Sequence, residues 1–281
     1  MKIVRFGEPG QEKPGIVGPD GTIRDVSGLV RDIDAAALAS GFSALRDADL
    51  STLPSVPAGS RLGCPVAHVG HFIAVGLNYA DHAAESGMPI PAEPILFSKA
   101  PSSIVGANDD VVIPKGSVKT DWEVEIAIVI GRRASYVSES EATSYVAGYT
   151  ICNDVSEREW QIERGGTWTK GKGAPTFGPL GPWLVTPDEI PDVQKLAMWL
   201  DVNGERMQTG NTSTMIFSCA HIVSYCSQFM ILEPGDVITT GTPPGVGLGM
   251  KPPRYLKAGE VVTLGIEALG EQRQNVKAYA G

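Results

Sequence analysis

The most informative stretch of the sequence is Asp121-Trp122-Glu123-Val124-Glu125-Ile126-Ala127-Ile128-Val129-Ile130. Its run of β-branched residues predicts a strand over Glu123–Ile130. Because side chains alternate between the two faces of a strand, Glu123 and Glu125 share one face. The opposite face is entirely apolar, which indicates that this strand belongs to the core of the protein.

Two neighbouring glutamates at the head of an apolar strand repel each other, and a poorly solvated site would raise that cost. A hard divalent cation such as Mg²⁺, which takes oxygen ligands, would offset it. Asp154 follows a second predicted strand, Gly148–Cys152, and could be a third oxygen ligand. Spacing alone favours the alternative interpretation, a pair of solvated glutamates and an aspartate in a turn.

A second cluster lies in the segment 78–87, where Ala80–Ser86 is expected to form a short helix. His82 and Glu85 are separated by three residues, so their side chains are neighbours on a helical turn. A carboxylate next to a histidine raises its basicity and fixes its orientation, which suits a general base that activates water. A surface ion pair is the alternative.

Composition limits the classes of protein that fit. The chain has 281 residues, of which 42% are hydrophobic and 20% charged, so it can form a sizeable core. Its net charge of −9 disfavours a nucleic acid or an anionic membrane as partner. The four cysteines form no C-x-x-C pair, and no apolar stretch resembles a membrane span or a secretory signal. A cytoplasmic protein is expected.

The pattern of turns predicts a β-rich chain in two parts, a small N-terminal domain (residues 1–70) and a larger domain (residues 71–281). In the first part we expect strands around a Pro19-Asp20-Gly21 turn, a helix over Asp32–Leu45 and a linker over Ser51–Ser60. In the second part, Asn203-Gly204 predicts a hairpin turn. Apolar residues at three- and four-residue steps predict a helix over Met215–Met230.

The glycine-rich segment Gly241–Gly249 does not fit a nucleotide-binding loop. It lacks the spacing and the Lys-Ser/Thr ending of a P-loop, and it lacks the G-x-G-x-x-G of a dinucleotide site. Its two prolines also remove backbone donors that a phosphate would need. A G-x-S-x-G serine-hydrolase motif is absent from the sequence as well.

Taken in order, these segments resemble the fumarylacetoacetate hydrolase family over roughly His71 to Lys277. The pieces that carry the resemblance are Gly76-Leu77-Asn78-Tyr79-Ala80-Asp81-His82-Ala83-Ala84-Glu85, Asp121-Trp122-Glu123-Val124-Glu125, Asn153-Asp154-Val155-Ser156, Trp168-Thr169-Lys170-Gly171-Lys172, Asn203-Gly204-Glu205, Thr212-Ser213-Thr214-Met215-Ile216-Phe217 and Gly241-Thr242-Pro243-Pro244-Gly245-Val246-Gly247. The resemblance implies an α+β, β-rich fold, a mixed β-sandwich or roll with short helices that follows a small N-terminal α+β domain. It also implies a homodimer.

The resemblance assigns roles to the candidate residues. It implies that Glu123, Glu125 and Asp154 bind Mg²⁺ or Mn²⁺, and that His82 with Glu85 activates water on a segment that orders when substrate binds. Further implied contacts to the substrate come from Lys172, Gln161 and Thr242. Lys170 competes with Lys172, and the spacing from Trp168 favours Lys172.

The implied chemistry is hydrolysis of a carbon–carbon bond in a 2,4-dioxo acid, either an acylpyruvate or a 2,4-diketo-3-deoxy sugar acid. The products would be a 2-oxo acid such as pyruvate and a carboxylic acid. The metal would stabilise the negative charge that develops on the leaving 2-oxo acid.

Members named ureidoglycolate lyase, 2-hydroxymuconate-type isomerases and oxaloacetate decarboxylases use the same kind of metal site. These activities therefore remain alternative interpretations, and so does a catalytically silent binding or scaffold protein. The retained pair His82 and Glu85 favours hydrolysis, because the other reactions need no activated water.

Overall fold

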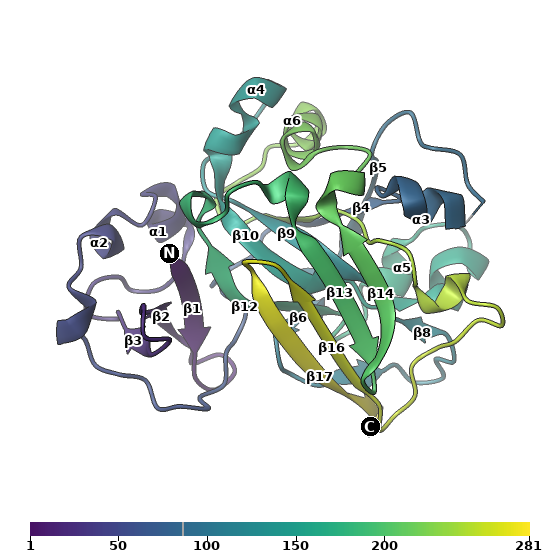
Figure 1. Cartoon of the computed structure of the whole chain (residues 1–281), viewed down its shortest axis with the longest axis horizontal. Helices are drawn as coiled ribbons and strands as arrows, with labels where there is room; N and C mark the ends of the chain where they lie inside the picture. The colour runs from purple at the N-terminus through teal and green to yellow at the C-terminus, as the bar shows by residue number, and fades with distance from the viewer. Residues whose placement is uncertain (86) are drawn as a thin grey trace.

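The computed structural model describes residues 1–85 and 87–281, and its described residues form three β-sheets (Figure 1). The largest sheet has the order β3-β2-β1-β12-β10-β9-β15-β4-β5, with β6 paired to β12. Its strands are β1 (Lys2–Phe6), β2 (Lys13–Val17), β3 (Ile23–Asp25), β4 (Phe72–Gly76), β5 (Ile95–Lys99), β6 (Ile104–Gly106), β9 (Val124–Ile130), β10 (Val146–Asn153), β12 (Gly178–Val185) and β15 (Val237–Thr239).

A five-stranded sheet has the order β14-β13-β16-β17-β7, and a two-stranded sheet pairs β11 with β8. Their strands are β7 (Val111–Ile113), β8 (Thr120–Asp121), β11 (Ser156–Glu157), β13 (Ala197–Val202), β14 (Glu205–Asn211), β16 (Val261–Ile266) and β17 (Gly270–Ala278). Parallel and antiparallel pairs occur together. These mixed sheets with short helices confirm the expected α+β, β-rich fold.

The helices are short and connect or cover the sheets. They are α1 (Ala35–Ala39), α2 (Ser43–Arg46), α3 (Ala80–Glu85), α4 (Glu139–Ala142), α5 (Thr169–Lys172), α6 (Cys219–Phe229) and the π-helical turn η4 (Glu159–Glu163). Single 3₁₀ turns are η1 (Leu50–Thr52), η2 (Pro101–Ser103), η3 (Thr143–Tyr145), η5 (Pro187–Glu189), η6 (Val193–Lys195), η7 (Thr212–Thr214) and η8 (Gly247–Gly249). Among the described helices, none is long and apolar enough to cross a membrane.

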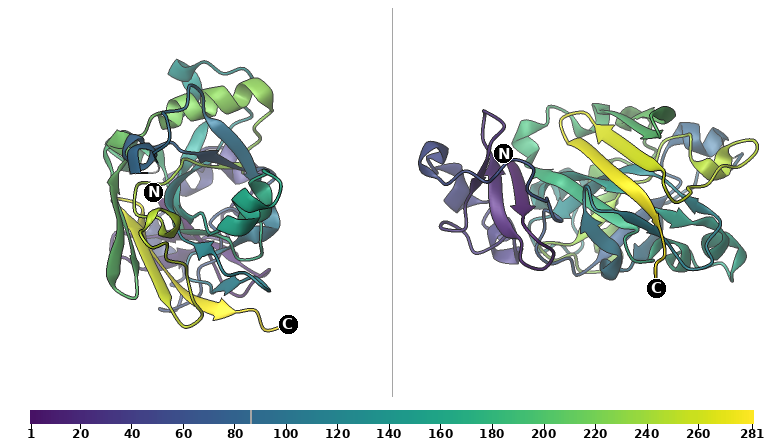
Figure 2. Two further views of the ribbon diagram at one scale, coloured as in Figure 1. Left: turned by 90° about the vertical axis from the view of Figure 1, so that its right-hand side faces the viewer. Right: turned by 90° about the horizontal axis from the view of Figure 1, so that it is seen from below.

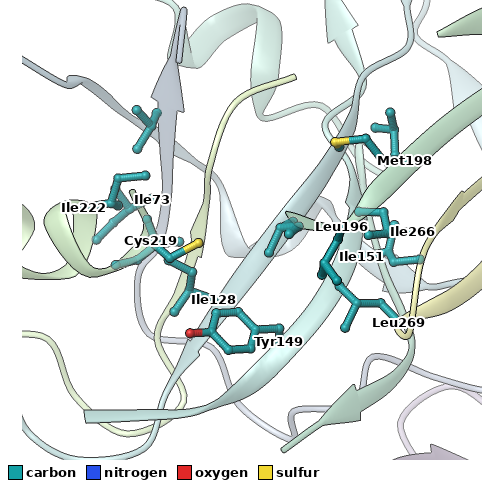
Figure 3. Close-up of a cluster of buried hydrophobic side chains, with 14 of the residues drawn as sticks. Ile73, Ile128, Tyr149, Ile151, Leu196, Met198, Cys219, Ile222, Ile266 and Leu269 are labelled. Atoms are coloured by element: carbon teal, nitrogen blue, oxygen red, sulfur yellow. The ribbon is translucent and has the colours of Figure 1, made fainter. Parts of the chain in front are cut away.

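The main core lies between the largest sheet and the five-stranded sheet. Figure 3 shows Ile128 and Ile151 of the first sheet together with Met198 and Ile266 of the second, and Ile222 of α6 belongs to the same cluster. A second cluster lies on the other face of the largest sheet. Strand β9 is therefore buried on both faces, which explains its nearly continuous apolar sequence.

The N-terminal residues gather at one end of the molecule, drawn in purple in Figures 1 and 2. Strand β1 pairs with β12 in antiparallel register, with Lys2 opposite Val185. The first strands therefore extend the largest sheet, while side chains such as Ile16 and Leu38 pack in the second cluster. The domain boundary near residue 70 stays a prediction.

The helix expected over Asp32–Leu45 is instead divided into α1 and α2. Gly41 and Phe42 both adopt left-handed backbone angles (φ 61° and 58°), which ends α1. The amides of these two residues bond back to Leu38 and Ala37, and the phenyl ring of Phe42 is buried in the second cluster. The helix is therefore broken where the Phe42 ring is buried, and the alanine-rich composition gives no sign of this break.

Two other expectations have different outcomes. The hairpin is confirmed, because β13 and β14 flank Asn203 and Gly204, whose positive φ angles fit a primed turn. The helix expected from Met215 begins only at Cys219, because the Ser218 side chain caps it by accepting from the amide of His221. The expected helix Ala80–Ser86 is observed as α3, and residue 86 lies outside the described residues.

Candidate active site

Strands β9 and β10 bring three carboxylates together. In their antiparallel register Cys152 lies opposite Glu125, and the amide of Asp154 donates to the carbonyl oxygen of Glu123 over 2.9 Å. One carboxylate oxygen from each of Glu123, Glu125 and Asp154 lies within 4.8 Å of the other two. All three residues are buried. Backbone pairing, rather than a flexible loop, therefore fixes the spacing of this acidic triad.

Two buried cations contact the first of these carboxylates. Lys172 Nζ donates to Glu123 Oε2 over 2.5 Å and to Asp154 Oδ2 over 2.7 Å. Arg158 Nη2 donates to Glu123 Oε1 over 2.7 Å, and its Nε donates to Asp121 over the same distance. Although burial opposes ionisation, Arg158 and Lys172 lower the pKa of Glu123 to about 2. Glu123 is therefore held as a carboxylate.

Glu125 has a different environment. Its Oε2 accepts from the amide of Gly241 over 2.9 Å, and no side-chain cation among the described residues forms an ion pair with it. Burial, together with the charges of Asp154 and Glu123, raises the pKa of Glu125 well above its usual range. A cation held between the three carboxylates would relieve this repulsion.

The residues present fit a divalent metal ion. Asp154 Oδ1 is buried and forms an ion pair with Lys99 Nζ, which lies 2.5 Å away. That ammonium group also donates to the carbonyl oxygens of Lys172 and Val155. The buried cluster contains four carboxylates, of Asp121, Glu123, Glu125 and Asp154, against three cations, of Lys99, Arg158 and Lys172. An all-oxygen set with excess negative charge is the donor chemistry that Mg²⁺ and Mn²⁺ prefer.

His82 and Glu85 project from α3. His82 Nδ1 lies 3.2 Å from Glu85 Oε2, and this carboxylate also accepts from the amide of Gly245 over 3.2 Å. The start of the segment is anchored by buried Asn78, whose side chain bonds the backbone of Phe217 and Thr240. Contacts from both ends therefore place the imidazole in a defined orientation.

The two polar candidates from the sequence lie beside the triad. Gln161 Oε1 accepts from Arg158 Nη1 over 3.0 Å. The Thr242 hydroxyl donates to the carbonyl oxygen of Val124 over 2.9 Å and accepts from Gln208 Nε2 over 2.8 Å. Thr242 is thus held in place by hydrogen bonds of its own.

A cavity of about 350 Å³ contains all eight candidate residues in its wall. They are His82, Glu85, Glu123, Glu125, Asp154, Gln161, Lys172 and Thr242. The structure also separates the two competing lysines, because Lys172 contacts the triad whereas exposed Lys170 donates to the carbonyl oxygen of Arg164. The sequence therefore predicted which side chains meet, and their roles remain predictions.

Sequence reasoning missed three members of the buried charge cluster, Lys99, Asp121 and Arg158. Asp121 accepts from Arg158 and also from the amides of Gly247 and Leu248, over 2.7 and 2.9 Å. Asp121 begins the Asp121–Glu125 motif and Arg158 follows the Asn153–Ser156 motif by two residues, so their position next to candidate ligands was a usable signal. Lys99 ends strand β5 and had no comparable signal.

The glycine-rich segment has a packing role in this structure. A Cβ atom on Gly245 would lie 1.9 Å from the carbonyl oxygen of Met207, and one on Gly241 would lie 2.8 Å from Cβ of Asn78. Both residues also have positive φ angles. These glycines let the segment pack directly against Asn78 and the backbone of Met207.

Comparisons with known proteins agree with this geometry. Residues 71–277 match the family model described as fumarylacetoacetate (FAA) hydrolase C-terminal. A relative from Burkholderia multivorans, described only as a hydrolase, is 61% identical over 280 residues, which is 99% of each chain. The chain belongs to the fumarylacetoacetate hydrolase family.

Several solved structures share the fold over nearly the whole length. A fumarylacetoacetate hydrolase from Exiguobacterium antarcticum is 38% identical with a TM-score of 0.90, covering 99% of this chain and 100% of that one. A 2-hydroxyhepta-2,4-diene-1,7-dioate isomerase from Mycobacterium marinum is 32% identical with a TM-score of 0.79, covering 100% of both. A maleylpyruvate hydrolase from Sphingobium sp. SYK-6, in complex with manganese and pyruvate, is 27% identical with a TM-score of 0.82, covering 99% of both.

Proposed function

We propose that this protein is a divalent-metal-dependent hydrolase that cleaves the C3–C4 bond of a 2,4-dioxo acid. The observation that carries the proposal is one cavity that holds both a negatively charged oxygen triad and a histidine–carboxylate pair. The triad suits a metal that binds a 2-oxo acid, and the pair suits activation of water. The products would be pyruvate or a related 2-oxo acid and a carboxylic acid.

Glu123, Glu125 and Asp154 are the residues that would hold Mg²⁺ or Mn²⁺. When bound, the cation supplies Lewis-acid stabilisation of the negative charge that develops on the oxygens of the 2-oxo acid. The similar maleylpyruvate hydrolase contains manganese and pyruvate, which supports this assignment. The proposal covers both Mg²⁺ and Mn²⁺.

His82 is the proposed general base. Its Nδ1 faces Glu85, so a neutral imidazole that donates from Nδ1 keeps a lone pair on Nε2 for a water proton. The water oxygen bonds to C4, the C3–C4 bond breaks, and its electron pair passes to C3. A proton on C3 then completes the 2-oxo acid, so one water molecule is consumed for each bond broken.

Lys172 and Gln161 are proposed to position the 2-oxo acid. The ammonium group of Lys172 lies next to two triad carboxylates, so it can also neutralise charge on a substrate oxygen. Gln161 is oriented by Arg158. Thr242 is proposed as a further contact to the substrate carboxylate from the cavity wall.

An isomerase reaction is the second candidate, and the 32% identity to the Mycobacterium marinum isomerase favours it. Ureidoglycolate lyase and oxaloacetate decarboxylase activities would use the same triad, and a silent binding protein would keep the cavity without turnover. His82 and Glu85 support hydrolysis over these alternatives, because only hydrolysis needs activated water.

The test is a screen of 2,4-dioxo acids with detection of pyruvate, run in Mg²⁺ and in Mn²⁺. Oxaloacetate, ureidoglycolate and 2-hydroxyhepta-2,4-dienedioate serve as substrates for the alternatives. Metal-dependent release of pyruvate from a 2,4-dioxo acid is the expected result. Turnover of an alternative substrate alone would contradict the proposal, and metal-dependent binding without any turnover would favour the silent protein.

A homodimer and a cytoplasmic location complete the proposal. Exposed apolar side chains lie around α6, namely Tyr136, Phe229 and Ile231, and the amide of Tyr136 bonds the carbonyl oxygen of Ser227 within that helix. Burial of such side chains is typical of homodimer contacts. Light scattering coupled to size-exclusion chromatography would measure the mass in solution.

A further inference from the structure

One end of the cavity is apolar. Besides the charged and polar residues of the site, its wall contains Leu77, Met88, Phe97, Ile162, Trp168 and Leu248. These side chains come from segments far apart in the sequence, and they converge only because the fold brings the segments together. The proposed function places the 2-oxo acid group of the substrate at the polar end of the cavity. The apolar end would then contact the acyl group at the other end of the substrate.

Two aromatic rings form the fixed part of this apolar wall. Phe97 and Trp168 pack edge to face with their ring centroids 5.2 Å apart. The indole of Trp168 lies against Gly76, where an added Cβ would be only 2.3 Å from its Cζ3 atom. Lys172 Nζ lies 5.3 Å from the centre of the Phe97 ring, so this ring adjoins the charged part of the cavity wall.

Three aliphatic side chains complete the wall at the mouth of the cavity. Met88, Ile162 and Leu248 are 49%, 52% and 37% exposed, and they come from the segment after α3, from η4 and from η8. Exposed apolar side chains that converge on one cavity are typical of a surface that an apolar group covers. The free energy gained by covering them depends on apolar area buried in the complex.

The cations of the cavity are already engaged at its other end. Among the described residues that line it, the cationic or titratable bases are His82, Arg158 and Lys172. Arg158 bonds Asp121 and Glu123, Lys172 bonds Glu123 and Asp154, and His82 contacts Glu85. A second carboxylate at the apolar end would therefore lose water without gaining a cationic partner.

We propose that the acyl end of the substrate is uncharged and apolar, so that the natural substrate is an alkyl- or aryl-substituted acylpyruvate with a single carboxylate. This inference rests on the proposed function, because the 2-oxo acid end is taken to lie at the triad. It distinguishes this chain from the relative named as an isomerase of a 1,7-dioate, whose substrate has a carboxylate at each end.

The test compares two ligands that differ only at the far end. 2-Oxohexanoate and 2-oxoadipate share the 2-oxo acid group and the number of carbon atoms, but the second acid ends in a carboxylate. Isothermal titration with the Mg²⁺-loaded protein should give a dissociation constant at least about tenfold lower for 2-oxohexanoate. Equal or tighter binding of 2-oxoadipate would overturn the inference.

A matched pair of variants locates the preference. Ile162→Lys adds a cation at the apolar end and should reduce the ratio of the two dissociation constants to about one or reverse it. Leu29→Lys adds the same charge at a similarly exposed aliphatic residue outside the cavity (42% exposed) and should leave the ratio unchanged. An unchanged ratio in Ile162→Lys would contradict the placement of the acyl group.

The two proposals can fail separately. Binding needs no bond cleavage, so a protein that binds 2-oxohexanoate selectively but releases no pyruvate from any acylpyruvate would refute the hydrolase and retain the apolar preference. Hydrolysis with preference for dicarboxylates would do the reverse. Binding of neither acid in the presence of Mg²⁺ would overturn both.

Discussion

The backbone amide of Asp154 donates to the carbonyl oxygen of Glu123, so two of the three triad residues are joined through the main chain as well as through Lys172. This bond lies where strands β9 and β10 end their pairing. A change in one triad side chain should therefore alter the charge of the site while the backbone around it keeps its geometry.

Replacement of one triad oxygen tests the metal site. Glu125→Gln keeps the shape of the side chain but removes a charged ligand, so Mg²⁺ affinity should fall on the order of 10²-fold or more. Titration calorimetry with Mg²⁺ measures this change directly. Glu271→Gln, at an exposed glutamate outside the cavity, is the matched control and should bind Mg²⁺ like the wild type. Unchanged affinity in Glu125→Gln would place the metal elsewhere.

His82→Ala separates hydrolysis from the alternatives. Loss of a general base should lower acylpyruvate hydrolysis by on the order of 10²–10⁴-fold. Metal binding and oxaloacetate decarboxylation should survive, because neither needs an activated water. The measurement is the ratio of the two rates in wild type, His82→Ala and Glu85→Gln, with a smaller loss in the last. Exposed His68 provides the control variant His68→Ala. A constant ratio across all variants would mean that His82 does not activate water.

Helix α3 and residues 87–91 should exchange amide hydrogens faster without ligand than with it. The α3 segment is anchored at Asn78 and carries Gly87 with a positive φ angle of 64°, and residues 87–90 are exposed. A lid that closes over the cavity would strengthen charge stabilisation by excluding water. Hydrogen-exchange mass spectrometry with Mg²⁺ and oxalate should find new protection there and none in buried β9. Equal exchange in both states would argue against a lid.

Asp121→Ala should destabilise the fold. The substitution leaves buried Arg158 with one carboxylate fewer and removes the acceptor for the amides of Gly247 and Leu248. Breaking a buried ion pair typically costs about 3–5 kcal/mol in the free energy of unfolding. Urea denaturation measures that energy, and Asp188→Ala, at an exposed aspartate near Arg46, should change it little. A small effect of Asp121→Ala would mean that Arg158 finds another partner.

The elements of the fold that could be predicted are those whose own residues form a recognisable sequence pattern. Strand β9 has its β-branched run, and the β13–β14 hairpin has its Asn203-Gly204 turn. Strand β17 lacks such a signal, because its buried face includes Gln272 and Gln274, whose amides bond distant carbonyl groups. The break at Phe42 likewise depends on a core that forms only in the folded chain.

The residues of the candidate site were likewise predictable only where the sequence around them carries a signal. Seven of the eight candidate residues stand in motifs whose order along the chain resembles a family, and Gln161 lies between two of these motifs, so their meeting in one cavity could be expected. Lys99 could not, because a buried lysine and a surface lysine look alike in a sequence. Its neighbours Val155 and Lys172 are 56 and 73 residues away, and only tertiary packing places them beside it.

The acidic triad is fixed by the pairing of β9 with β10, whereas His82 and Glu85 stand on α3, a single short helix outside the sheets. The proposed metal binding and the proposed activation of water therefore depend on separate elements of the chain. Evolution could exchange the helix for another and retain the proposed metal site, while the reaction of the bound acid changes. Such a separation would allow hydrolases and isomerases to evolve on one shared fold.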